Sequence, residues 1–146
     1  MSKTNFEKVK EFHRAFGVPS AENPTEPTEI LMDLRANLIS EEFTEFLDAH
    51  YLSEYGDPVS EFKPNLIEIA DAIGDMLYVI YGTADQYGLD ADAIFAEVHR
   101  SNMSKLDENG KPLFHDGLTG PKGKVRKSAR FEEPKLREVI YGDRSD

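Results

Sequence analysis

The apolar residues of this chain recur at the three- and four-residue intervals of amphipathic helices. The first series predicts a helix over residues 4–16, and its apolar positions are Phe6, Val9, Phe12 and Phe16. Thr4 and Glu7 have the spacing of a capping box at its start, and Gly17 ends it. The proline-rich residues 17–27 then predict a stiff, non-helical loop, because proline fixes the backbone and removes a hydrogen-bond donor.

Three further helices are predicted, over residues 28–53, 64–87 and 90–105. The residues at their starts support these boundaries, because Thr28 and Asp90 suit N-caps and Pro64 suits the first helical turn. A polar connector over residues 54–63 separates the two long helices.

The remainder of the chain, residues 107–146, predicts irregular structure with short elements. The turn signal DENGKP suits the closing of a small hairpin, and a short turn is expected around Leu136 and Val139. Because the chain shows four substantial helices and no series of strands, we expect an all-α bundle of four to five helices. Its 146 residues predict one domain over 1–146, in which 107–146 forms an irregular basic tail or flap.

Both long helices carry carboxylates in the sector where their apolar residues lie. In the first helix the acids follow a stripe made by Leu34 and Leu38, and they are Glu41, Glu42 and Glu45. The second helix is apolar nearly all round, yet one sector holds Glu68, Asp71 and Asp75. An ionised carboxylate is costly to bury alone, so these inward faces predict a compensating cation.

A divalent metal is the simplest such cation. Carboxylate-rich ligation suits Mg²⁺, with Mn²⁺ as the second choice, and this many acids predict more than one ion. The other explanation is an ion-pair network in which the acids contact Arg14, Arg35 or a neighbouring helix.

The spacing Glu41-Glu42-x-x-Glu45, followed by an acidic turn that ends at Asp75, resembles the metal-binding signature of the all-α nucleoside triphosphate pyrophosphohydrolases. This superfamily includes MazG-like enzymes, dimeric dUTPases and phosphoribosyl-ATP pyrophosphohydrolase. The resemblance spans roughly residues 5–105 and continues more weakly to about 140. Ala72 stands where the family usually has a glutamate, which leaves open whether Glu68 or Asp71 joins Asp75.

The resemblance implies hydrolysis between the α and β phosphates of a nucleoside triphosphate, giving a monophosphate and pyrophosphate. The predicted metal ligands are Glu42, Glu45, Asp71 and Asp75, with Glu68 in reserve. Glu41, at the edge of the acid sector, is the candidate for orienting or deprotonating the attacking water. The sequence around the motifs is most similar to the dUTPase-like group, so dUTP or another deoxypyrimidine triphosphate is the first expected substrate. Non-standard nucleotides and phosphoribosyl-ATP are the alternatives.

Several residues are predicted to bind the substrate. Asn102 and Lys105 suit hydrogen bonding and phosphate contact, and the basic cluster holds Lys122, Lys124 and Arg126. His13 and Phe16 suit a base pocket, although a half-buried or surface histidine is the plainer interpretation of His13. An ordinary helix terminus and a solvated tail would equally explain the basic residues. Tyr78 and Tyr81 lie off the acid face, where core packing or a dimer contact is expected.

Composition limits the remaining possibilities. The net charge of −11 disfavours nucleic acid and anionic membranes as partners, and no apolar run is long enough for a membrane span. The absence of cysteine excludes disulfides and agrees with a cytoplasmic protein. Because four helices cannot cover the second acidic helix on every side, a homodimer with a shared core, or a dimer of dimers, is expected. A helical interaction module without catalysis is the alternative that Ala72 favours.

Overall fold

The computed structural model describes residues 2–51 and 65–142. Its elements are α1 (Asn5–Phe16), α2 (Glu29–Tyr51), α3 (Leu66–Gln86), α4 (Ala91–Met103), β1 (Leu113–Phe114), β2 (Val125–Arg126) and α5 (Leu136–Tyr141). The described chain is mostly helical, which confirms the predicted all-α class. The chain divides into two compact units, Met1–Leu89 and Asp90–Asp146. Among the described residues, no helix combines the length and the apolar character needed to cross a membrane.

The capping residues determine where the helices begin and end. Thr4 accepts a hydrogen bond from the backbone of Glu7 at 3.1 Å, and the Glu7 carboxylate accepts one from the backbone of Thr4 at 2.7 Å. This is the predicted capping box, and Gly17 ends α1 with a φ of 68°. In the same way, the Asp90 side chain accepts from the backbone of Ala93 and starts α4.

α3 is somewhat shorter than the predicted helix over residues 64–87. α3 begins at Leu66 instead of Pro64, because the Asn65 side chain accepts from the backbone N–H groups of Ile67 and Glu68 and acts as the N-cap. The predicted connector over residues 54–63, Pro64 and the last two predicted residues of the first acidic helix lie outside the described residues.

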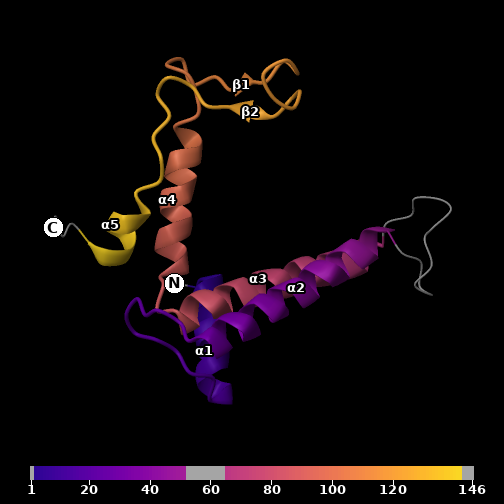
Figure 1. Ribbon diagram of the computed structural model, residues 1–146, viewed down its shortest axis with the longest axis vertical. Helices are drawn as coiled ribbons and strands as arrows, with labels where there is room; N and C mark the ends of the chain where they lie inside the picture. Colours follow the sequence, from indigo (N-terminus) through magenta and orange to yellow (C-terminus); the bar gives the residue numbers. More distant parts are fainter. Residues whose placement is uncertain (1, 52–64, 143–146) are drawn as a thin grey trace. The chain divides into compact units, whose positions relative to one another are not determined.

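In the first unit, α2 and α3 run side by side in opposite directions (Figure 1). At one end, the guanidinium of Arg35 donates to the carbonyl of Val79 at 2.5 Å and to the hydroxyl of Thr83 at 3.0 Å. At the other end, the backbone N–H of Asn65 donates to the carbonyl of Ala49 at 3.4 Å. These contacts fix the register of the antiparallel pair.

α1 packs against the C-terminal half of α3. Phe6 and Val9 are buried there, whereas Phe16 is 71% exposed. Nδ1 of His13 lies 2.6 Å from the Asp85 carboxylate, whose side chain is 1% exposed and also accepts from the hydroxyl of Ser20. The interpretation of His13 as a half-buried or surface residue is therefore wrong, because Asp85 gives its ring a buried partner.

The loop between α1 and α2 follows the end of α3. The backbone N–H of Ala21 donates to the carbonyl of Asp85 at 3.1 Å, and that of Thr25 donates to the carbonyl of Tyr87 at 3.0 Å. A Cβ atom at Gly88 would overlap the carbonyl group of Asn23. The loop is thus held by backbone hydrogen bonds and by close packing.

In the second unit, the C-terminal segment is tied to α4 by polar contacts. Arg100 makes a two-pronged ion pair with Glu97 at 2.8 and 2.9 Å, and this contact, with a backbone hydrogen bond from Lys135, lowers the pKa of Glu97 to about 2. The buried Ser101 hydroxyl donates to the carbonyl of Glu132 at 2.8 Å. α5 lies beside α4 and replaces the short turn that the sequence predicted.

The strand pair departs from the hairpin expected around DENGKP. Leu113 pairs with Arg126 and Phe114 with Val125, so residues 115–124 connect the two strands. The DENGKP segment forms a separate turn, in which the backbone N–H of Gly110 donates to the carbonyl of Asp107 at 3.0 Å.

Replacing either of two glycines of α3 by alanine should change the stability of the protein in opposite directions. A Cβ at Gly82 would lie 2.9 Å from Nη2 of Arg35 and 3.1 Å from Nε2 of His13, both of which are buried, whereas a Cβ at Gly74 would meet nothing within 4 Å. We expect Gly82→Ala to lower the free energy of unfolding by about 1–3 kcal/mol. Gly74→Ala should raise it by roughly 0.5–1 kcal/mol, because alanine favours the helix. Urea unfolding measures both, and equal stability of the two variants would contradict the packing described for Gly82.

Candidate active site

The register of α2 and α3 brings the predicted metal ligands to the same level. The Arg35 side chain contacts Val79 and Ala49 contacts Asn65, so the fifteen-residue stretches 35–49 and 65–79 run past each other. Glu42 is therefore level with Ala72, midway between these contacts. At 1.5 Å per residue, all six acids of the two helices fall within about 10 Å along the helix axes. The antiparallel pairing thus makes the two acidic segments neighbours in space, although they are far apart in the sequence.

The carboxylates repel one another most strongly at Glu42. Burial, followed by the charges of four other acids, raises its pKa above the usual glutamate value, and these acids are Glu45, Asp75, Glu41 and Asp71. Only acids near one another across the two helices can have this effect. Both helices therefore contribute to one concentration of negative charge.

The acids are more exposed than their positions beside apolar residues suggested. Glu42 is half-buried, whereas Glu41, Glu45, Glu68, Asp71 and Asp75 are exposed. α1 packs on the other half of α3, where it contacts residues from Tyr78 to Asp85, and leaves the acidic half uncovered within the first unit. The expected inward faces are thus an open acidic face.

Within the part of the chain that the structure describes, no ion pair neutralises this acidic face. Arg35, which the ion-pair explanation invoked, donates instead to Val79 and Thr83, and burial lowers its pKa. The ion-pair explanation with Arg35 is therefore wrong. Unneutralised carboxylates with a raised pKa are the condition that a bound cation relieves.

The donor set fits a hard divalent cation, because all its members supply carboxylate oxygens. Among the described residues, however, no three His, Asp or Glu side chains are gathered closely enough to hold a metal ion. The acids interact through their charges without meeting at one point. The set Glu42, Glu45, Asp71, Asp75 and Glu68, and the role of Glu41, accordingly stay predictions.

Ala72 occupies the contact between the two helices. Its side chain is 3% exposed and level with Glu42. Asp71 precedes it by one residue and Asp75 follows it by three, so both lie beside the contact and not within it. A small side chain at this position lets α2 and α3 approach closely, and the acids of α3 then lie along the edge of the contact.

The structure separates the two residues predicted to contact a base. His13 is buried against Asp85, and Phe16, one turn further along α1, is exposed and packs against Phe12 with ring centroids 4.2 Å apart. Sequence analysis missed Asp85 and Ser20 as partners of His13. No local pattern could have found Asp85, because 72 residues separate it from His13.

The remaining predicted substrate-binding residues lie in the second unit. Nζ of Lys105 donates to the side-chain carbonyl of Asn102 at 2.6 Å, so these two predicted residues are together at the end of α4. The Asn102 amide group keeps its own donors. A cation and an amide donor at one point suit a phosphate or carboxylate oxygen.

The basic cluster lies on β2 and the segment before it. Lys122, Lys124 and Arg126 are exposed, and none of them is ion-paired with another described residue. Lys127, in contrast, pairs with Glu133 at 2.8 Å and lies 4.0 Å from the centre of the Phe131 ring. The tail therefore neutralises part of its own charge, and Lys122, Lys124 and Arg126 are among the cations that it leaves without an ion pair.

Charge is divided unequally between the two units. Residues 1–89 hold 17 acidic and 6 basic side chains, which accounts for the whole net charge of −11, and residues 90–146 hold 11 of each. The acids predicted to bind metal and the cations predicted to contact phosphate thus belong to different units.

The raised pKa of Glu42 predicts a pH-dependent effect of Glu42→Gln. A carboxyl group whose pKa is raised by folding stabilises the protein while it is protonated, and this contribution is lost as pH rises through the folded-state pKa. Without divalent metal, Glu42→Gln should therefore raise the melting temperature at pH 7 and have little effect near pH 4. Thermal melts in chelator at both pH values measure this. A lower melting temperature at pH 7 would contradict the repulsion described above.

Comparisons with known proteins show which family this chain resembles. A chain of 35% identity over 120 residues is the uncharacterised protein L479 of Acanthamoeba polyphaga mimivirus; the match covers 76% of this chain and 39% of the viral protein. The chain thus spans about two fifths of that relative. A candidate NTP pyrophosphohydrolase from Exiguobacterium sp. 255-15 matches with 24% identity and a TM-score of 0.47 over 93% of this chain and 92% of its own. Residues 9–102, which contain α2, α3 and both acidic segments, match the phosphoribosyl-ATP pyrophosphohydrolase family (PRA-PH), and the chain belongs to this family.

Proposed function

We propose that the protein is a metal-dependent nucleoside triphosphate pyrophosphohydrolase. It cleaves the bond between the α and β phosphates and releases a nucleoside monophosphate and pyrophosphate. Membership of the pyrophosphohydrolase family supports the reaction class. The observation that carries the proposal is the antiparallel register of α2 and α3, which brings the acids of both helices to within about 10 Å along the helix axes.

The acidic face gives each carboxylate a defined task in this proposal. Mg²⁺ (or Mn²⁺) would be held by Glu42 and Glu45 of α2 and by Asp71 and Asp75 of α3. Glu68, near the N-terminal end of α3, is the reserve ligand. Bound Mg²⁺ supplies neutralisation of the phosphate charge and lowers the pKa of a coordinated water. More than one ion is proposed, because one cation leaves most of this negative charge uncompensated.

Glu41 acts on the attacking water. It is exposed and next to the half-buried Glu42, so its carboxylate can accept a proton at the edge of the acidic face. The water attacks one phosphorus of the α–β anhydride and the bridging P–O bond breaks. The water proton passes to Glu41, and the two products carry the separated phosphates away.

The second unit supplies the cations that the substrate needs. Lys105 with Asn102, and the three unpaired cations Lys122, Lys124 and Arg126, are proposed to hold the phosphates. These residues belong to a unit of zero net charge, whereas the acidic unit by itself repels a polyphosphate. In this proposal the bound metal offsets that repulsion.

The preferred substrate is proposed to be dUTP or another deoxypyrimidine triphosphate, with the exposed Phe16 near the base, because the burial of His13 against Asp85 leaves that ring no access to it. Phosphoribosyl-ATP is the second candidate, which the matching family favours. A helical interaction module without catalysis is the third, because Ala72 stands where a further carboxylate ligand is usual. The protein is proposed to act in the cytoplasm.

A homodimer is also proposed, and an exposed stripe on α3 supports it. The stripe consists of large apolar residues at spacings of seven, four and three, namely Leu66, Ile73, Leu77 and Ile80. Such a continuous face on one helix is a usual feature of subunit contacts. A second copy would cover the stripe and complete the helical core. The same surface could also serve in a dimer of dimers.

Product analysis tests the reaction. With Mg²⁺, a panel of dUTP, other nucleoside triphosphates and phosphoribosyl-ATP should yield a monophosphate and pyrophosphate, and chelator should abolish turnover. Glu42→Gln and Asp75→Asn should each lower kcat/KM roughly 100-fold or more, because metal-based charge stabilisation is worth several kcal/mol. Asp33→Asn, on the solvent face of α2, is the matched control and should keep full activity.

Product analysis and thermal melts together distinguish the alternatives. Release of a diphosphate and orthophosphate would contradict α–β cleavage, and wild-type turnover by folded Glu42→Gln protein would contradict the metal site. No turnover together with no Mg²⁺-dependent rise in melting temperature would favour the interaction module.

Measurement of the molar mass in solution tests the proposed dimer. Ile73→Glu or Ile80→Glu should halve the mass measured by light scattering, because each places a charge inside the proposed contact. Asn37→Glu adds the same charge to the exposed side of α2 and should leave the mass unchanged. Wild-type protein with the mass of one chain would refute the proposal directly.

A further inference from the structure

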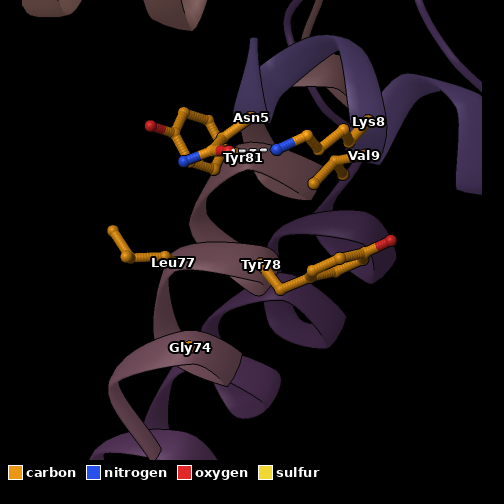
Figure 2. A pocket seen from close by; sticks show the side chains of 7 residues that line it. All are labelled: Asn5, Lys8, Val9, Gly74, Leu77, Tyr78 and Tyr81. Carbon is orange, nitrogen blue, oxygen red and sulfur yellow. Dashed lines mark hydrogen bonds between the residues drawn. The ribbon is translucent and has the colours of Figure 1, made fainter. Parts of the chain in front are cut away.

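A cavity of about 190 Å³ opens between α1 and α3 in the first unit. Its walls are formed by Val9 of α1 and by Leu77, Tyr78 and Tyr81 of α3. Figure 2 shows Leu77 and Tyr78 pointing to opposite sides of the opening, with Asn5 and Lys8 at one end and Gly74 at the other. The lining is thus mostly apolar, and its polar groups are concentrated at one end.

Aromatic contacts from α1 hold both tyrosine rings in place. The Tyr81 ring lies 6.2 Å from that of Phe6 at an angle of 32°, and the Tyr78 ring meets that of Phe12 edge-on at 5.5 Å. Tyr78 is nevertheless 40% exposed, so core packing alone does not account for it. Two rings fixed from behind and open in front are a preorganised surface for another flat ring.

The polar end of the cavity carries an available positive charge. Nζ of Lys8 donates to the side-chain carbonyl of Asn5 at 3.0 Å, and no carboxylate among the described residues pairs with it. This arrangement is unusual in a unit whose net charge is −11. Lys8 and the Asn5 amide group together suit an anionic oxygen.

Gly74 leaves the other end of the cavity open. It stands in the interior of α3, where glycine weakens a helix, and a Cβ there would meet nothing within 4 Å. The packing of the described residues gives no reason for a glycine at this position. Close approach of a molecule from outside the chain does give one.

We propose that this cavity binds a single planar aromatic ring that carries an anionic group. The ring lies against Tyr78 and Tyr81 above Gly74, and the anion contacts Lys8 and Asn5. A cavity of this volume has room for one ring, since a cavity of about 150 Å³ can hold benzene. Around α3, Gly74 lies about 100° from Asp75 and about 60° from Asp71, so this site borders the acidic face without including its carboxylates.

An apolar segment of a second copy suits the cavity less well. Such a segment would bury Lys8 and Asn5 without partners, which is unfavourable for both groups. The exposed stripe of α3 includes Leu77, however, so the test must distinguish a small ligand from a subunit contact.

Amide NMR of the full-length protein tests the proposal with benzoate, a carbocyclic acid, and uracil-6-carboxylate, a pyrimidine acid. Saturable shifts should centre on Gly74, Leu77 and Tyr78 and leave Glu42 and Glu45 unchanged. The stronger of the two probes identifies the ring class. Benzyl alcohol, which lacks the charge, should bind at least tenfold more weakly than benzoate.

Two variants and one control locate the site. Gly74→Leu should abolish saturable binding without unfolding the helix, because its side chain enters open space. Lys8→Gln should weaken binding about tenfold, as expected for loss of a charge-assisted contact. Lys10→Gln removes the same charge from α1 outside the cavity and should bind like the wild type.

Three outcomes would overturn the proposal: no saturable shifts with either acid, equal binding to Gly74→Leu, or equal binding to Lys8→Gln. Absence of binding together with a change in mass of Gly74→Leu would assign the cavity to a subunit contact instead. The titration contains no nucleotide and no metal, so it succeeds or fails independently of the pyrophosphohydrolase activity.

Discussion

Arg35 holds α2 against the last turns of α3 through hydrogen bonds that its buried guanidinium cannot exchange for water. The rest of the first unit depends on this contact. It sets the register that places Glu42 level with Ala72, and it requires a glycine at position 82. Because His13 approaches the same glycine and pairs with Asp85, α1 and the proline-rich loop are positioned by the same buried group of polar side chains.

This register also places many carboxylates of like charge close together, which is unfavourable. Six acids share about two turns of an antiparallel pair, and burial together with the charges of four of the others raises the pKa of Glu42. Such an arrangement is unfavourable in an isolated chain, and functional sites commonly contain groups of this kind. The match to the pyrophosphohydrolase family covers these two helices and both acidic segments.

α3 offers three different surfaces around its circumference. One carries the acids, the opposite one carries the apolar stripe, and between them α1 leaves the cavity above Gly74. A helix that is apolar nearly all round must be covered on all sides. The proposed metal, second copy and ring ligand would each occupy a surface that α1 and α2 leave open.

The sequence by itself determined the helical class, the capping of α1 and α4 and the presence of two acidic segments, because local spacing and capping chemistry depend on near neighbours. It placed the start of α3 two residues early, since Asn65 and Pro64 are both good starting residues and only Asn65 caps. The tertiary structure decided which residues meet over long separations, such as His13 with Asp85 and Arg35 with Val79. It also decided that the acids face outward, because burial depends on which elements cover a face, and local periodicity carries no information about that cover.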